Sequence, residues 1–384
     1  MDFTDLAVQT TFWILGFILL FRIPRCKSVR GLIPRFSLSI IIPARNEEKA
    51  LSILLASLRE QKYARKEVIV VDDQSEDKTM EVAEKGGVKL IQSKAIPKGW
   101  LGKPWACYQG ARVAQGEILI FLDADTFIEE DGLEKIAHTH MKRDEVVTIQ
   151  PYHETRQLYE QLSAFFNIIT MAAMGSFTIM GDFVQPIGLF GPCVVMRRKH
   201  YFRSGGHREV KGEVVEDLAL GEKLRKQKIR ISCYGGKGTI SFRMYPNGIG
   251  ELIDGWSKGF ATGALKTYVP ILLVIIAWIG GGISATRYLI EASFDISAIS
   301  ISVWATAYLG YAIQIYWMLS RIGNFKFYTA LLYPIPLLFF IILFIYSLVM
   351  VFIRKRVRWK GRTIYLEGGQ HNTVTSYNTN SDRD

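Results

Sequence analysis

Two aspartates stand one residue apart directly after a continuous apolar run. Residues 118–122 read Ile-Leu-Ile-Phe-Leu, and Asp123 and Asp125 follow. Such a run is typical of a buried strand in a parallel sheet, and ligands bind at the carboxyl ends of these strands. Carboxylate oxygens suit hard divalent cations. The spacing predicts that Asp123 and Asp125 hold Mg²⁺ or Mn²⁺ bound to a nucleotide diphosphate. A polar turn after a buried strand is the alternative.

Two earlier apolar runs, at 38–43 and 68–71, also end in polar residues. Helical patterns separate the runs, so the order βαβαβαβ predicts an α/β domain with a Rossmann-like, mostly parallel sheet. The carboxyl ends of parallel strands meet at one edge of the sheet. We therefore expect the polar residues to gather around a nucleotide-sugar ligand there; they are Pro43, Arg45, Glu47, Asp72 and Asp73.

Three further charged residues are candidates for the same site. Lys103 lies in a Gly- and Trp-rich turn at 99–105 and is predicted to contact a phosphate or nucleotide, with a solvated lysine as the alternative. Glu216 and Asp217 open a predicted helix, where Asp217 is a candidate for taking a proton from an attacking group. Stabilisation of the helix start by acids is the alternative. The chain has no GxGxxG after its first strand and no GxxxxGK[ST], which disfavours dinucleotide and P-loop chemistry.

Composition favours a membrane over a nucleic acid as the partner of this basic chain. The formal net charge is +11, which suits either partner. Hydrophobic residues make up 49 % of the chain, and no basic run interleaved with aromatic residues suggests a nucleic-acid groove. We therefore expect contact with membrane lipids and none with nucleic acid. The cysteines show no CxxC spacing, which predicts free thiols in a reducing compartment; they are Cys26, Cys107, Cys193 and Cys233.

Four apolar segments are long enough to span a membrane. The first, at 6–23, follows two aspartates and precedes several basic residues, so it predicts an uncleaved anchor with the next domain in the cytoplasm. The others lie at 269–285, 299–319 and 328–353. Four crossings would put the basic tail outside, although the positive-inside rule favours basic residues in the cytoplasm. The last segment, with Pro334 and Pro336, is therefore a candidate to re-enter without crossing. The basic residues in question are Arg22, Arg25, Lys27, Arg30 and Arg35 near the start, and Arg354, Lys355, Arg356, Arg358, Lys360 and Arg362 near the end.

Three stretches between these features have weaker signals. Residues 159–177 are apolar and aromatic, which predicts a helix at the membrane surface or along an acceptor groove, or else a core helix. Residues 188–196 predict a strand after a tight turn, and 204–207 a loop. The pattern at 250–264 predicts one amphipathic interfacial helix. The expected division is an anchor at 1–24, the α/β domain at 36–248, the interfacial helix at 249–266, membrane segments at 267–353, and a basic then polar tail at 354–384, disordered from Gln370.

The strand-end motifs resemble those of family 2 glycosyltransferases with the GT-A fold. The resemblance covers residues 39–266 and rests on Ile-Pro-Ala-Arg-Asn-Glu-Glu at 42–48, Val-Asp-Asp at 71–73, Asp-Ala-Asp at 123–125 and Glu-Asp at 216–217. It implies a nucleotide-sugar donor, a divalent metal and an inverting single displacement. It also implies roles: Pro43 and Glu47 at the nucleotide, Asp73 at uracil, Asp123 and Asp125 at ribose and metal, and Asp217 as the base toward the acceptor.

Further motifs resemble the members of this family that glycosylate carotenoid acids in bacterial membranes. They include Phe-Gly-Pro at 190–192, Ser-Gly-Gly-His at 204–207, Phe-Arg-Met-Tyr at 242–245 and Gly-Trp-Ser-Lys at 255–258. The resemblance implies glucose from UDP-glucose, a lipophilic carboxylic acid as acceptor, a glycosyl ester as product, and other carotenoid-pathway enzymes as possible partners. It places the acceptor near Gly191, Pro192, His207 and Trp256.

One departure from the wider family narrows the function. Processive members carry Gln-x-x-Arg-Trp, but the residues before Trp256 are Leu252-Ile253-Asp254-Gly255. A polymer-extruding synthase is therefore disfavoured. Two alternatives stay open: a glycosyltransferase for another lipid, such as a hopanoid, diacylglycerol or polyprenyl phosphate, and an inactive membrane scaffold.

Overall fold

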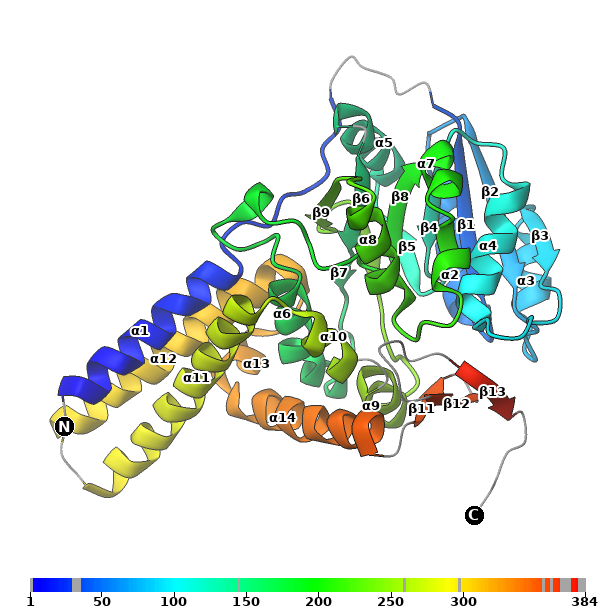
Figure 1. Cartoon of the computed structure of the whole chain (residues 1–384). Helices are drawn as coiled ribbons and strands as arrows, with labels where there is room; N and C mark the ends of the chain where they lie inside the picture. Colours follow the sequence, from blue (N-terminus) through cyan, green and yellow to red (C-terminus); the bar gives the residue numbers. More distant parts are fainter. Residues whose placement is uncertain are drawn as a thin grey trace.

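A computed structural model describes residues 3–29, 36–143, 145–257, 260–295, 298–353, 356–359, 362–366 and 374–378. An α/β domain lies beside a group of long apolar helices (Figure 1). Several residues used in the charge argument lie outside the described ranges, namely Arg30, Arg35, Arg354, Lys355 and Lys360, as does Lys258 of the 255–258 motif.

Seven strands of the described chain form the main sheet, in the order β3-β2-β1-β4-β8-β6-β9. Only β8 runs antiparallel to its neighbours, so the mostly parallel sheet is confirmed. The strands are β1 (Leu38–Ala44), β2 (Lys66–Asp72), β3 (Lys89–Gln92), β4 (Ile118–Leu122), β6 (Val146–Gln150), β8 (Cys193–Arg197) and β9 (Ile231–Gly235).

Helices cover both faces of this sheet because successive strand residues point to opposite sides. Ile40 and Ile42 of β1 pack in the same core cluster as the leucines of α2, while Ile41 packs with Ala106 and Ala111 of α4. Leu51, Leu54, Leu55 and Leu58 form the buried face of α2. The helices are α2 (Glu48–Arg59), α3 (Thr79–Lys85), α4 (Gly102–Val113), α5 (Gly132–Arg143), α7 (Arg198–Arg203) and α8 (Glu216–Lys226).

A second, small sheet holds the segment that follows the paired aspartates. Its order is β5-β10-β7, with β5 at Thr126–Ile128, β7 at Tyr152–His153 and β10 at Ile240–Phe242. Because β5 starts one residue after Asp125, this sheet fixes the turn that carries both aspartates. The predicted loop at 204–207 is in part a short 3₁₀ helix, η3 (Gly206–Val210).

Three long helices lie side by side: α1 (Phe3–Leu19), α11 (Val269–Asp295) and α12 (Ala298–Ile322) (Figure 1). After the short α13 (Phe327–Leu331), α14 (Pro334–Leu348) runs across their direction and continues as one π-helical turn, η4 (Val349–Ile353) (Figure 1). In the described chain, three helices are long and apolar enough to cross a membrane: 269–294, 298–322 and 334–353. At 17 residues, α1 is shorter.

Polar contacts fasten α1 to α11 and α12. Gln9 Nε2 donates to the carbonyl of Gly281 at 2.8 Å, and Gln314 Nε2 donates to the carbonyl of Trp13 at 2.6 Å. A Cβ atom at Gly16 would collide with the Gln314 side chain. Helix α1 therefore packs closely against α11 and α12, which come much later in the sequence.

The stretch at 159–177 is a core segment, and not the surface helix that was one of the two expectations. It forms a 3₁₀ turn, η1 (Tyr159–Ser163), and α6 (Ala164–Ala173), whose residues are nearly all buried against α11, α12 and α14. Its polar residues have partners inside this core: Gln161 Oε1 accepts from the backbone of Lys326 and from Thr329 Oγ1. The isolated pattern could not show that a second apolar layer covers it.

One expectation about the carboxyl-terminal part is also corrected. The predicted interfacial helix contains α9 (Ile249–Ser257) and α10 (Phe260–Lys266), and residues 258 and 259 between them lie outside the described ranges. Residues 374–378 of the tail predicted to be disordered form β13, which pairs with β12 (Arg362–Leu366), itself paired with β11 (Arg356–Trp359).

A further short 3₁₀ turn, η2, lies at Gly181–Phe183. The prediction of free cysteines is confirmed, and all four are buried.

Burial of His153 predicts that folding stability falls with acid. Its ring packs against Phe242 and Phe325, and burial lowers its pKa from 6.5 to about 4. Between these values the unfolded chain binds a proton that the folded chain does not, so stability is complete above pH 6.5 and declines toward pH 4, by up to about 3 kcal/mol. The unfolding temperature in detergent should drop less between pH 7.5 and 5 in His153→Gln than in the native chain. Equal drops would contradict this.

Candidate active site

A cavity of about 700 Å³ opens where β1, β2 and β4 end, between α4, α8 and α9. Nine of the residues predicted from the sequence line it, although they come from five separate segments. They are Pro43, Arg45, Glu47, Asp73, Lys103, Asp123, Asp125, Glu216 and Asp217. The expectation that these strand ends converge on one site agrees with the fold.

Lys103 is the centre of charge in this cavity. Its Nζ lies 2.9 Å from Asp123 Oδ1, 3.1 Å from Glu216 Oε1 and 3.3 Å from Asp217 Oδ2. It belongs to the first turn of α4, where the helix dipole disfavours a cation, so the carboxylates must hold it there. Conversely, Glu216 and Asp217 open α8, where the dipole favours acids.

These contacts determine the pKa values of Lys103 and Asp217. Burial opposes the charge on Lys103, but Asp123, Asp217 and Glu216 outweigh it and hold the lysine pKa well above its usual value. Burial, and then repulsion by Glu216, raise the pKa of Asp217 to about 8 although Lys103 opposes the change. A carboxyl with such a pKa exchanges protons near neutral pH.

Arg45 fastens the two loops that follow β1 and β2. Its Nη1 donates to the carbonyls of Asp73 and Gln74 at 2.7 and 2.9 Å, and the Asp73 N–H donates to the carbonyl of Ala44 at 2.8 Å. Asn46 and Gln74 both have left-handed backbone conformations, with φ of 53° and 56°. The loops are thus tightly bent and cross-linked, which fixes the cavity edge around Asp73.

Asp72 does not line the cavity, contrary to the prediction for it. It is 2 % exposed at the end of β2, and its Oδ2 accepts the backbone N–H of Ser75 at 3.2 Å. Alternation along a strand explains this, because adjacent residues point to opposite sides. Asp72 shapes the turn, and Asp73 faces the ligand space.

The four residues expected near an acceptor do not line the cavity either. His207 is buried, with Nδ1 3.0 Å from the hydroxyl of Tyr201, and burial lowers its pKa to about 4. Trp256 is also buried, and its Nε1 donates to Ser163 Oγ at 3.0 Å. Both therefore stabilise the packing behind the site.

Gly191 and Pro192 lie next to residues that line the cavity. A Cβ atom at Gly191 would collide with the Asp217 carboxylate, so a side chain is excluded there. The Pro192 carbonyl accepts the N–H of Asp123 at 3.1 Å. Both residues were expected near the acceptor, and their neighbours in the structure are the Asp217 carboxylate and the backbone of Asp123.

The sequence reasoning missed the wall opposite the strand ends. Val214, Val215, Met244 and Tyr245 line it together with Glu251, Asp254 and Gly255 of α9. The spacing of Glu251, Asp254 and Gly255 on one helical face was the available signal. It was assigned to a membrane interface because the apolar face of α9 is equally clear.

Comparison with known proteins decides the family. The family model for Glycosyl transferase family 2 matches residues 39–205. The 4,4'-diaponeurosporenoate glycosyltransferase of Staphylococcus haemolyticus is 36 % identical over 331 residues, 85 % of this chain and 88 % of that protein. The enzyme of the same name from Staphylococcus aureus is 34 % identical over 330 residues, with the same coverage.

The chain belongs to glycosyl transferase family 2. The fold agrees: the mannosyltransferase PcManGT of Pyrobaculum calidifontis, solved with GDP-Man and Mn²⁺, superposes with a TM-score of 0.51 at 16 % identity, over 85 % of this chain and 94 % of that one. The fold of this glycosyltransferase is thus GT-A-like.

The carboxylates in the cavity of this glycosyltransferase fit a divalent cation whose coordination is completed by oxygen atoms of the substrate. Among the residues that the structure describes, no three His, Cys, Asp or Glu side chains gather as a full metal cage. Asp123 and Asp125 do share the cavity wall, and the Asp123 side chain is 27 % exposed to it. Two carboxylates plus phosphate oxygens are the usual Mg²⁺ arrangement in sites of this kind.

Removal of the Lys103 charge should destabilise the fold. In Lys103→Gln the three carboxylates lose their shared counter-charge, at a cost of about 3 kcal/mol, and the unfolding temperature should fall by several degrees. Lys103→Gln combined with Glu216→Gln should recover part of the loss, because one repelling carboxylate is gone. Lys85→Gln, at an exposed position on α3, is the matched control. An unfolding temperature equal to that of the control would refute the role of Lys103.

Proposed function

We propose that the protein transfers glucose from UDP-glucose, with inversion, to the carboxyl group of a carotenoid acid and so forms a glucosyl ester. The observation that carries this proposal is the similarity to two 4,4'-diaponeurosporenoate glycosyltransferases over 85 % of the chain. The cavity supports it because acids, one lysine and an apolar wall meet there, beside helices suited to a membrane. Such a site accepts both a charged donor and a lipid acceptor.

The strand-end residues are assigned to the donor. Pro43, Glu47 and Asp73 would receive the nucleoside, and Asp123 and Asp125 would hold Mg²⁺ or Mn²⁺ at the diphosphate. PcManGT supports this with its bound GDP-Man and Mn²⁺. The cation, when bound, neutralises the departing diphosphate. Lys103 lies next to Asp123 and adds positive charge beside the same phosphates.

In the proposed displacement the acceptor oxygen bonds to the anomeric carbon as the bond to UDP breaks, and UDP leaves with the electron pair. A carboxylic acid is already ionised at neutral pH and needs little help from a base. Asp217, with its pKa raised to about 8, is then in part a neutral acid that does not repel this anion. With an alcohol as acceptor, the same carboxyl would serve as the base.

We also propose that α1, α11 and α12 cross the membrane and that the α/β domain lies in the cytoplasm. Three crossings return the chain to the cytoplasmic side after α12. Support for α14 lying there as a surface helix is its direction across the other three (Figure 1), its packing on α9 and α10, and the bond from Ser347 Oγ to the Ser257 carbonyl. This topology keeps the basic tail inside, as the charge rule requires.

The test uses the full chain in detergent with radiolabelled UDP-glucose, Mn²⁺ and a carotenoid acid, and counts label extracted into organic solvent. We expect metal-dependent label in an ester, abolished by EDTA and reduced at least about 100-fold in Asp125→Ala. Glu84→Ala, an exposed carboxylate on α3, is the control and should keep full activity.

The outcomes separate donor from acceptor. Metal-dependent release of UDP without labelled carotenoid would retain the glycosyltransferase and reject the carotenoid acid, and other membrane lipids would then be supplied. Full transfer by Asp125→Ala would reject the metal assignment.

A further inference from the structure

The proposed mechanism leaves one wall of the cavity unused. Val215, Met244 and Tyr245 line the cavity, and all three are partly buried apolar residues that pack against a single core cluster. That cluster contains side chains of α6, α11, α12 and α14. Apolar packing therefore connects this wall of the cavity to the helices suited to a membrane.

The same wall adjoins both groups of catalytic carboxylates. Val215 directly precedes Glu216 and Asp217, and the N–H of Arg243, one residue before Met244, donates to the Asp125 carbonyl at 3.3 Å. A molecule that lies on this wall thus has its end beside the reacting centre.

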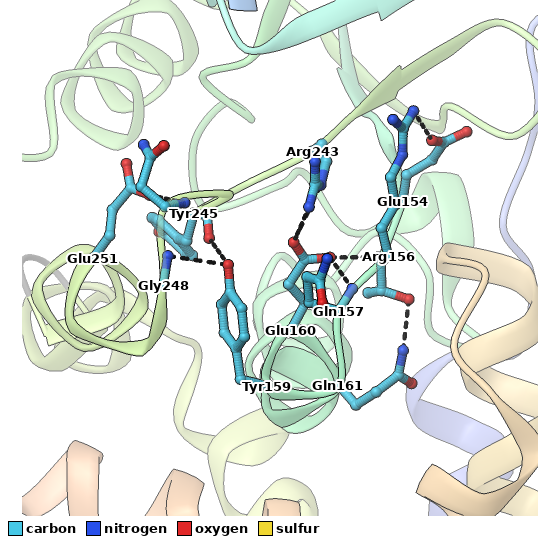
Figure 2. Close-up of polar contacts among 12 residues, drawn as sticks. Glu154, Arg156, Gln157, Tyr159, Glu160, Gln161, Arg243, Tyr245, Gly248 and Glu251 are labelled. Carbon is cyan, nitrogen blue, oxygen red and sulfur yellow. Dashed lines mark hydrogen bonds and ion pairs between the residues drawn. The ribbon is translucent and has the colours of Figure 1, made fainter.

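An ion pair between a partly exposed arginine and a buried carboxylate fixes the wall on one side. Figure 2 shows Arg243 reaching toward Glu160 of η1; its Nη2 and Nε lie 2.7 and 3.1 Å from Glu160 Oε1. Glu160 is fully buried and also accepts the backbone N–H groups of Arg156 and Gln157. With its charge and oxygens satisfied, the pair holds the start of the 243–245 segment in place.

Tyr159 fixes the other side. Its hydroxyl donates to the Tyr245 carbonyl at 2.8 Å and accepts the N–H of Gly248 at 3.1 Å, so that it clamps the turn before α9 (Figure 2). Tyr245 has a left-handed φ of 58°, and a Cβ atom at Gly255 of α9 would collide with its ring. The orientation of this aromatic ring at the cavity is therefore imposed by the fold.

We propose that Val215, Met244 and Tyr245 form the binding subsite for the apolar chain of the acceptor, directly next to its reactive carboxyl group. The inference rests on the proposed function and adds the place where the lipid lies. Glu251 and Asp254 of α9 share this wall with the three apolar residues. The rest of the cavity is dominated by carboxylates, which exclude a hydrocarbon; they are Glu47, Asp73, Asp123, Asp125, Glu216 and Asp217. Only this wall offers apolar contact that continues toward the membrane side, and the polarisable methionine and the tyrosine ring suit a flat conjugated chain.

The test replaces Met244 by a polar side chain of nearly equal shape. In Met244→Gln the KM for the carotenoid acid should rise about five- to tenfold, whereas the KM for UDP-glucose should change by less than about twofold. Val215→Thr should act in the same direction. Met244→Leu, which restores an apolar side chain, should return the acceptor KM to near the native value, and this rescue separates the subsite from a general packing defect. Met80→Gln on α3 is the control for the chemical change.

Each result bears on the proposal. Acceptor KM values for Met244→Gln and Val215→Thr equal to those of the control would overturn the subsite while the proposed function stands. A rise in both KM values that Met244→Leu does not reverse would also overturn it, since it indicates distortion of the whole cavity. Failure of the native protein to glycosylate any carotenoid acid, with UDP still released, would reject the proposed acceptor and this subsite with it.

Discussion

The ammonium group of Lys103 allows three carboxylates from two distant parts of the chain to share one wall of the cavity. Asp123 follows β4, and Glu216 and Asp217 begin α8, so without a cation between them the two segments would repel each other. This contact constrains the position of α4, because the first turn of α4 must bring Lys103 between the segment after β4 and the start of α8. A cation at the unfavourable end of a helix is stabilised by its neighbours, and the neighbours are stabilised by it.

A second set of contacts connects this charged centre to the apolar helices. The turn with Asp123 and Asp125 continues into β5 of the small sheet. The segment 243–245, which follows β10 of the same sheet, is held by Glu160 and Tyr159. Both of these belong to η1, which packs on α14. The reacting edge of the sheet and the membrane-suited part of the protein are thus not separate units joined by a linker. They share a wall, and in the proposed function lipid access and catalytic geometry depend on the same residues.

The sequence predicted the strand ends well because their signal is local. A buried strand needs consecutive apolar residues, and a ligand edge needs polar residues at its end, so β1, β2 and β4 and nine of the lining residues could be assigned from short stretches. The missed parts depend on contacts between distant segments. The burial of His207 and Trp256 arises from what packs against them, and no stretch of their own sequence carries that information. The same packing decides the core position of 159–177, which the sequence left as one of two alternatives. For α9 the spacing of its acids was a signal, but only its neighbours show that this face lines the cavity. Asp72 was misassigned for a smaller reason, since two adjacent acids at a strand end point in opposite directions.

The docking of α1 has a consequence for the synthesis of the protein. The partners of Gln9 and Trp13 are Gly281 and Gln314, so the first helix leaves the ribosome long before the groups that satisfy it exist. During translation α1 must wait, with its polar side chain unpaired and its glycine surface uncovered, while the α/β domain forms beside it. Truncation after the α/β domain would therefore leave the start of the chain without its partners. The order of assembly is consequently the reverse of a simple progression: α1 is made before α11 and α12 but reaches its final environment only after they are in place.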